Sequence, residues 1–223
     1  MELVKENFQL QLDKILEDIK RAGIRPTLLL HSCCGPCSSY VISYLAQYFN
    51  ITVFFYNPNI FPEAEYQLRL SEQKRLIEEL KKEDVSVDLT AAAYDHDEFL
   101  SFVKGFESEK EGAGRCSLCF ELRLRKTYDM ALREGFDYFC STLSVSPHKN
   151  ALVLNKIGRS VNESMWLVSD FKKRDGYKKS IELSKKYELY RQEYCGCEFA
   201  MNTHQHFASL FFIKRSYNLG SSK

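Results

Sequence analysis

The sequence has little glycine and proline, no long apolar run and almost no net charge. Ten glycines and five prolines in 223 residues exclude collagen-like and low-complexity chains. No apolar run reaches the roughly 18 residues that cross a bilayer. The N-terminus lacks the basic segment and apolar core of a secretory signal. We therefore expect a globular protein in the cytoplasm, with no membrane partner.

The net charge of +1 is divided unevenly along the chain. Residues 1–155 carry 18 Lys and Arg against 23 Asp and Glu, whereas residues 156–223 carry 13 against 7. The basic part is a candidate surface for a phosphate backbone. A solvated charged face would have the same composition, so both interpretations stay open at this point.

Apolar, strand-like segments alternate with segments of helical periodicity. The strand-like segments are residues 27–30, 51–56, 85–89 and 136–141. The helical segments are residues 2–22, 38–49, 63–82, 95–102 and 116–134. A polar loop is expected at residues 141–149, followed by a mixed helical region. This alternation predicts an α/β fold, with a Rossmann-like, mostly parallel sheet covered by helices.

Two chemically distinctive segments fall where predicted strands end. These are residues 31–37 and the Asn57-Pro58-Asn59 loop. Ligands of parallel sheets bind at the carboxyl ends of the strands, so we place the site there. We predict one domain over residues 1–223, with C-terminal helical additions and a basic helical part at about 156–223.

Seven of the eight cysteines fall into three tight groups. The groups are Cys33, Cys34 and Cys37; Cys116 and Cys119; and Cys195 and Cys197. Thiols stay reduced in the cytoplasm, so such groups indicate metal binding or redox chemistry rather than disulfides. The eighth, Cys140, lies inside a predicted strand, where a cysteine usually acts as a small buried apolar side chain.

Three kinds of chemistry are compatible with these cysteines. Cys34-Gly35-Pro36-Cys37 has the C-G-P-C pattern of thiol–disulfide oxidoreductases, but it leaves the other groups unexplained. Four thiolates also suit structural Zn²⁺, although such sites usually hold small local folds together. The third option is an iron–sulfur cluster with four cysteine ligands. Seven cysteines exceed that need and suggest a second centre, either a metal site or a redox dithiol.

Five segments, taken in order, resemble the QueH-type epoxyqueuosine reductases of queuosine biosynthesis. They are residues 31–37, 57–60 with Glu65, Tyr66 and Arg69, 115–119, 141–147, and 190–197. The resemblance implies reduction of epoxyqueuosine in tRNA to queuosine, the last step of that biosynthesis. It also implies a fold like the adenine-nucleotide α-hydrolases (PP-loop-like), with the cysteine loop in place of their glycine-rich loop. The implied cofactor is a [4Fe-4S] cluster, with a second mononuclear iron or a redox-active cysteine pair nearby.

The resemblance suggests roles for individual cysteines. We expect Cys33, Cys34, Cys116 and Cys119 to hold the cluster. Cys195 and Cys197 would serve the second centre and act catalytically, as iron ligands or as a redox pair. Cys37 is the alternative to one of the four cluster ligands. The sequence does not identify the electron donor.

The predicted substrate-binding residues are Asn57, Asn59, Tyr66, Arg69 and His148. The two asparagines also suit a turn, and Arg69 also suits an ion pair with Glu65 four residues earlier. Arg123 has the same two interpretations, phosphate contact or an ion pair along its helix. Two other functions remain open: a zinc-binding RNA-binding module, and a thiol-redox or sulfur-transfer enzyme that uses the C-G-P-C pair.

Overall fold

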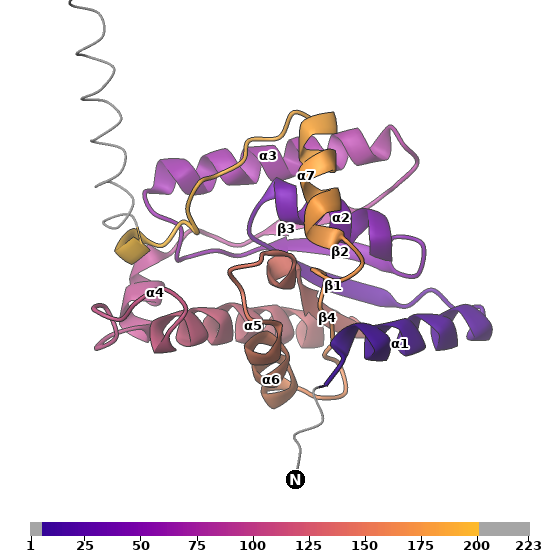
Figure 1. Ribbon diagram of the computed structural model, residues 1–223, viewed down its shortest axis with the longest axis horizontal. Coiled ribbons are helices and arrows are strands. Elements are labelled where there is room, and N and C mark those ends of the chain that lie inside the picture. The colour runs from indigo at the N-terminus through magenta and orange to yellow at the C-terminus, as the bar shows by residue number, and fades with distance from the viewer. Residues whose placement is uncertain (1–5, 201–223) are drawn as a thin grey trace, which may run out of the picture.

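The computed structural model describes residues 6–200 and contains a four-stranded parallel sheet (Figure 1). Its strands are β1 (Thr27–Ser32), β2 (Asn50–Phe55), β3 (Asp88–Ala91) and β4 (Tyr138–Ser141). The strand order is β3-β2-β1-β4, and every neighbouring pair is parallel. Leu28 pairs with both Ile51 and Tyr138, so β1 is central. The predicted α/β fold class is confirmed.

Helices cover both faces of the sheet. They are α1 (Phe8–Ala22), α2 (Gly35–Leu45), α3 (Glu63–Lys81), α4 (His96–Phe102), α5 (Gly114–Glu134), α6 (Ala151–Val161) and α7 (Gly176–Lys186). Figure 1 shows α2, α3 and α7 on one face and α4, α5 and α6 on the other. Parallel strands need such crossovers, because a short turn cannot return the chain to the same end. In the part of the chain that is described, no helix is both long and apolar enough to span a bilayer.

Side chains of β1 alternate between two apolar cores. Leu28 and Leu30 point into the core shared with α2, which includes Phe49 and Phe171. Leu29 points into the opposite core, beside Phe139. Burial on both faces explains why the strand is a continuous apolar run in the sequence rather than an alternating one.

The strand order reverses direction between β1 and β4. The chain runs outward from β1 to β2 and β3, and then returns to the other side of β1 for β4. In open α/β sheets a crevice for ligands forms at this position, beyond the carboxyl ends of the two strands. Cys33 follows β1 there, and a 3-10 helix, η1 (Thr142–Val145), follows β4.

Four predicted elements differ from the structure. The helix predicted at residues 38–49 runs from Gly35 to Leu45. The first helix begins at Phe8, capped by the Asn7 side chain, and residues 2–5 of its predicted span lie outside the described residues. The third strand lies at Asp88–Ala91 rather than at residues 85–89, because Val85 and Val87 pack against the core instead of pairing. The predicted polar loop at 141–149 starts with the buried helix η1, whose Ser144 hydroxyl accepts a hydrogen bond from Phe171 N.

The C-terminal helical additions are α6 and α7. Residues 201–223, including His204 and His206, lie outside the described residues. The basic helical part is therefore described only as far as residue 200, and the single domain over 1–223 stays a prediction.

Candidate functional site: a thiol-lined cavity beside a wider pocket

The three segments that carry the grouped cysteines meet beyond the ends of β1 and β4. They are the turn from β1 into α2, the first turns of α5, and the segment after α7. Cys197 forms an isolated antiparallel bridge with Ile60, and Phe61 N donates to the Gly196 carbonyl at 2.8 Å. These contacts tie the third segment to the loop after β2 and bring Cys195 toward the other cysteines.

Gly196 allows this close approach. Its φ is +99°, a conformation that L side chains rarely adopt. A Cβ there would stand 2.9 Å from Ile60 Cγ1 and 3.1 Å from Arg69 Nη1. The same Arg69 donates to the carbonyls of Cys195 and Tyr194, at 3.2 and 3.3 Å. The C-G-C segment is thus held by its backbone, which leaves its two thiols available.

A narrow cavity of about 30 Å³ lies between the three segments. Its lining includes five thiols, those of Cys33, Cys116, Cys119, Cys195 and Cys197. The other lining residues are Asn59, Phe99, Arg115, Phe120, Arg123, Leu143 and Lys149. Two arginines and a lysine are present, and no carboxylate lines this cavity. These positive charges would complement an anionic, thiolate-bound centre.

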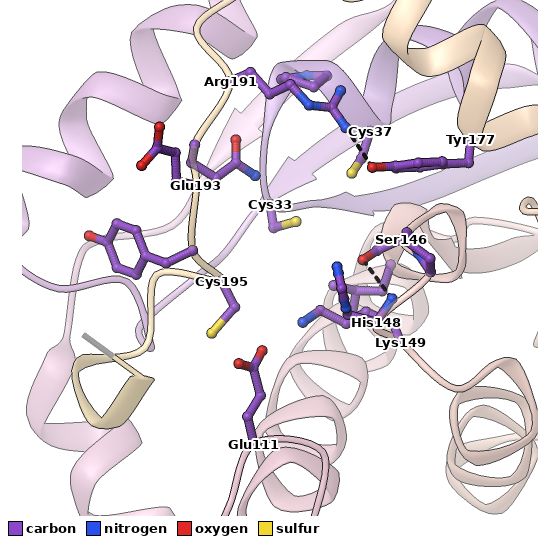
Figure 2. Close-up of a pocket in the computed structure, with 15 residues that line it drawn as sticks. Cys33, Cys37, Glu111, Ser146, His148, Lys149, Tyr177, Arg191, Glu193 and Cys195 are labelled. Carbon is purple, nitrogen blue, oxygen red and sulfur yellow. Dashed lines mark hydrogen bonds between the residues drawn. The ribbon is translucent and has the colours of Figure 1, made fainter. Parts of the chain in front are cut away.

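A wider cavity of about 430 Å³ adjoins the narrow one (Figure 2). Its lining comprises Cys33, Pro36, Cys37, Glu111, Leu143, Ser146, Pro147, His148, Lys149, Tyr177, Arg191, Gln192, Glu193, Tyr194 and Cys195. Figure 2 shows His148 and Lys149 across the cavity from Cys195 and Glu193. Its volume suits a small molecule or a single nucleoside. Four residues line both cavities: Cys33, Leu143, Lys149 and Cys195.

Cys34 and Cys37 differ in exposure and in acidity. Cys34 caps α2 and is 1% exposed, with its sulfur 3.9 Å from that of Cys33. Hydrogen bonds from Cys33 and Cys37 hold the pKa of Cys34 well below its usual range, and the same contacts raise the pKa of Cys37 well above it. A C-G-P-C redox pair needs an accessible attacking sulfur. The burial of Cys34 therefore counts against that function.

Cys195 and Cys197 form a second polarised pair. A hydrogen bond from Cys197 lowers the pKa of Cys195 to about 6, and the pKa of Cys197 is correspondingly raised. All eight cysteines are free thiols, so no disulfide joins this pair. Cys140 is fully buried with its sulfur 3.2 Å from the Leu167 carbonyl, which confirms the predicted packing role.

Two of the predicted substrate-binding residues line a cavity. Asn59 lines the narrow one and His148 the wide one. Asn57 is buried and donates to the Ser32 carbonyl at 2.8 Å. Tyr66 packs against Phe55 in a small apolar cluster and donates to the Ala92 carbonyl at 2.9 Å. Neither side chain is in the lining of the narrow or the wide cavity.

The contacts of Arg69 are likewise structural. It is 1% exposed and forms an ion pair with Glu65 at 2.7 Å, the pairing that the four-residue spacing suggested. Arg123 differs, because among residues 6–200 it has no such partner, and it bonds the backbone of its own helix instead. The structure thus separates two arginines that the sequence treated alike.

Sequence reasoning missed several lining residues. Lys149, Tyr177, Arg191 and Glu193 line the wide cavity, and none of them was among the predicted site residues. Lys149 directly follows His148, a predicted substrate-binding residue, so the sequence could have indicated that Lys149 lies at the site. The other three lie on α7 or on the segment after it, and only the tertiary structure brings them to the site.

His31 is a buried support rather than a lining residue. Its Nε2 donates to the Tyr56 carbonyl at 3.1 Å, and its Nδ1 accepts from the Ser141 hydroxyl at 2.9 Å. Burial, assisted by the charge of Arg123, lowers the pKa of His31 to about 4. The ring is therefore neutral at pH 7, and it joins the ends of β1, β2 and β4 beneath the cysteines.

The donor set fits a thiophilic metal centre. Five thiols line one small cavity, Cys34 lies beside Cys33, and Gly112 N donates to the Cys116 sulfur at 3.1 Å. Such sulfurs suit iron–sulfur clusters and zinc. Across residues 6–200, no three Cys, His, Asp or Glu side chains are already arranged around a metal position. Ligation by these cysteines therefore stays a prediction.

The fold and the two cavities define a parallel α/β protein with a thiol-lined site. The family model described as Epoxyqueuosine reductase QueH matches residues 28–203, a range that contains all three cysteine groups. The chain therefore belongs to the epoxyqueuosine reductase QueH family and is an oxidoreductase.

Relatives named Epoxyqueuosine reductase QueH match this chain over most of their length. The chain is 43% identical over 202 residues to the Epoxyqueuosine reductase QueH of Staphylococcus epidermidis, covering 88% of this chain and 85% of that one. It is 40% identical over 202 residues to that of Streptococcus pyogenes serotype M1, covering 87% and 79%. It is 32% identical over 181 residues to that of Thermotoga maritima, covering 78% and 90%.

Among solved structures, a glutamine-dependent NAD+ synthetase from Acinetobacter baumannii in complex with ADP matches this chain. The match covers 89% of this chain and 49% of that one, at 11% identity and a TM-score of 0.36. The chain thus spans about half the length of that protein. A likeness of this degree carries no argument about the site.

Proposed function

We propose that this chain reduces epoxyqueuosine in tRNA to queuosine, the last step of queuosine biosynthesis. The observation that carries the proposal is the meeting of three cysteine segments at one cavity, in a member of the epoxyqueuosine reductase family. The reaction consumes two electrons and two protons, releases the epoxide oxygen as water, and leaves a carbon–carbon double bond. Membership of a reductase family does not favour the alternative function, a zinc-binding RNA-binding module.

The proposed cofactor is a [4Fe-4S] cluster held by Cys33, Cys34, Cys116 and Cys119. When bound, it would supply electrons one at a time. Three of these thiols line the narrow cavity, which supports the assignment. Cys34 lines neither cavity, so Cys37 is retained as the alternative fourth ligand.

Cys195 and Cys197 are proposed as the second centre, either as ligands of a mononuclear iron or as a redox pair. Cys195 lines both cavities, so it lies between the proposed cluster site and the proposed substrate pocket. Its lowered pKa of about 6 keeps the sulfur in the thiolate form that both roles require.

The wide cavity is proposed to hold the modified base. Tyr194 and Tyr177 offer aromatic rings for an unstacked base, as anticodon-type loops require. His148 and Arg191 offer hydrogen-bond donors in the same lining. Lys149 is the cationic residue common to the linings of both cavities, which supports a role as proton donor to the departing oxygen.

The tRNA backbone is proposed to bind the basic part of the chain. Tyr177 in the wide cavity is followed on α7 by Lys178, Lys179, Lys185 and Lys186. Binding of this kind releases counterions, so affinity for tRNA should fall steeply as salt rises, measured by filter binding at several salt concentrations. A salt-independent affinity would contradict the proposed binding of the tRNA backbone.

The electron donor of the reaction stays unidentified. The eight free thiols support the proposed cytoplasmic location.

The direct test is conversion of the nucleoside in tRNA. Anaerobically purified protein would be incubated with epoxyqueuosine-containing tRNA and dithionite, and the tRNA digested and analysed by mass spectrometry. We expect epoxyqueuosine to be replaced by a nucleoside lighter by one oxygen. Unchanged epoxyqueuosine with iron-loaded protein would contradict the proposed reaction.

A further inference from the structure

Arg123 is a buried cation without a carboxylate partner. It lies on α5 and is 3% exposed. Its Nε donates to the Cys119 carbonyl at 3.0 Å, and its guanidinium lies over the Phe120 ring, 5.6 Å from the centroid. Among residues 6–200 no Asp or Glu forms an ion pair with it, whereas the equally buried Arg69 pairs with Glu65 at 2.7 Å.

The surroundings of Arg123 leave few sources of negative charge. Glu98, on the other side of Tyr56, is already paired with Lys126 at 2.7 Å and accepts the Tyr56 hydroxyl at 2.6 Å. No carboxylate lines the narrow cavity that Arg123 faces.

Thiols are the acidic groups that remain in that cavity. Cys33 and Cys119 line the same cavity as Arg123, and the Arg123 Nε donates to the Cys119 carbonyl. A buried charge without a counter-charge is unfavourable, so an anion held by these sulfurs would stabilise Arg123. Arg115, the second arginine of the lining, is different because carbonyl oxygens of the 107–109 loop bind its guanidinium.

We propose that Arg123 is the fixed counter-cation of the cysteine centre, a positioning residue that offsets the negative charge of the thiolates and of the cluster they hold. This inference rests on the proposed iron–sulfur function. Each added electron makes the centre more negative, so a fixed positive charge stabilises the reduced state more than the oxidised one. Arg123 therefore raises the reduction potential of the centre.

The test compares charge-removing and charge-retaining variants in the anaerobically purified holoprotein. The variants are Arg123→Met, Arg123→Lys and, as a matched control, Arg125→Met. Arg125 lies two residues along the same helix, is exposed and pairs with Glu121 at 2.7 Å. The readouts are iron per chain, melting temperature, and midpoint potential from a redox titration followed by electron paramagnetic resonance.

We expect the midpoint potential of Arg123→Met to be lower than that of the wild-type protein. The potential of Arg123→Lys should lie close to the wild-type value. A tenfold change in the ratio of reduced to oxidised centre at fixed potential corresponds to about 59 mV for a one-electron couple. Arg125→Met should leave the potential unchanged. If Arg123→Met fails to hold iron, retention of iron by Arg123→Lys supports the same role for the charge.

Two results would overturn the inference. One is a fully loaded Arg123→Met protein with the wild-type potential. The other is an Arg123→Lys protein that behaves like Arg123→Met, since the shape of the guanidinium and not its charge would then matter. Failure of the proposed function looks different, because the wild-type protein itself would bind no iron, and the inference would fail with it.

Discussion

The narrow and the wide cavity share a wall but differ in chemistry. The narrow one, about 30 Å³, has five thiols and three cationic side chains and no carboxylate. The wide one, about 430 Å³, has acids, bases and aromatic rings in one lining. The first is lined by thiols and cations that suit a thiolate-bound metal centre, whereas the second has the size and mixed polarity of a ligand pocket. The proposed cofactor and substrate sites are thus distinct, and only four residues belong to both.

The largest expected effect comes from removing a thiol shared by both cavities. Cys33→Ser should lose iron and activity together, because Cys33 is a proposed ligand and also faces the substrate pocket. Iron content per chain and the tRNA conversion assay provide the measurements.

Cys140→Ala is the matched control for that thiol. Cys140 is buried in the core and lines neither cavity. This variant should keep its iron and lose only about 1 kcal/mol of unfolding free energy. Normal iron in Cys33→Ser would contradict the assignment of Cys33 as a ligand.

The next effect concerns the boundary between the cavities. Lys149→Met should lower kcat by about 100-fold, because a positioned proton donor contributes on that scale. Iron content should stay at the wild-type level, since Lys149 is not a ligand. Steady-state kinetics with the iron-loaded variant measure this, and a change confined to KM would assign Lys149 to binding alone.

A smaller effect is expected from a residue of the wide cavity alone. Arg191 donates to the Tyr177 hydroxyl at 3.2 Å and lies over its ring, so it forms part of the pocket wall. Arg191→Ala should raise KM for tRNA by about tenfold, the cost of one charge-assisted contact. Iron content and kcat should change little. Loss of iron in this variant would show that the two cavities are not independent.

The smallest effect concerns the segment that leads to Cys195. Glu72 accepts from Tyr190 N at 2.7 Å, and hydrogen bonds from Arg75 hold the pKa of Glu72 below its usual range. Its stabilising contribution is therefore present at neutral pH and is lost as pH falls through this lowered pKa. Arg75 is partly exposed, so we expect only about 0.5 kcal/mol.

Urea unfolding at pH 7 and at about pH 4 measures this contribution. Glu72→Gln should be less stable than wild type at pH 7, and the difference should shrink in acid. An equal difference at both pH values would contradict the pairing.

Strands β1, β2 and β4 were predictable from the sequence because each lies in a compact, mostly apolar run. The edge strand β3 was misplaced by a few residues, since Val85 and Val87 are apolar but pack without pairing. The site was predictable as far as its cysteines, whose tight grouping is visible in one dimension. The Arg69–Glu65 pair was also indicated by its four-residue spacing. The hydrogen bonds from Arg69 to the carbonyls of Tyr194 and Cys195 were not predictable, because those residues lie 125 and 126 positions away in the chain.

Iron and acid-labile sulfide per chain, measured with the visible spectrum of anaerobically purified protein, test the central claim most directly. The claim is that three cysteine segments hold one iron–sulfur centre. It predicts a brown protein with a broad band near 400 nm and about four irons and four sulfides, with a fifth iron if the second centre is a metal. A colourless protein with one zinc, and no iron after anaerobic reconstitution, would contradict it.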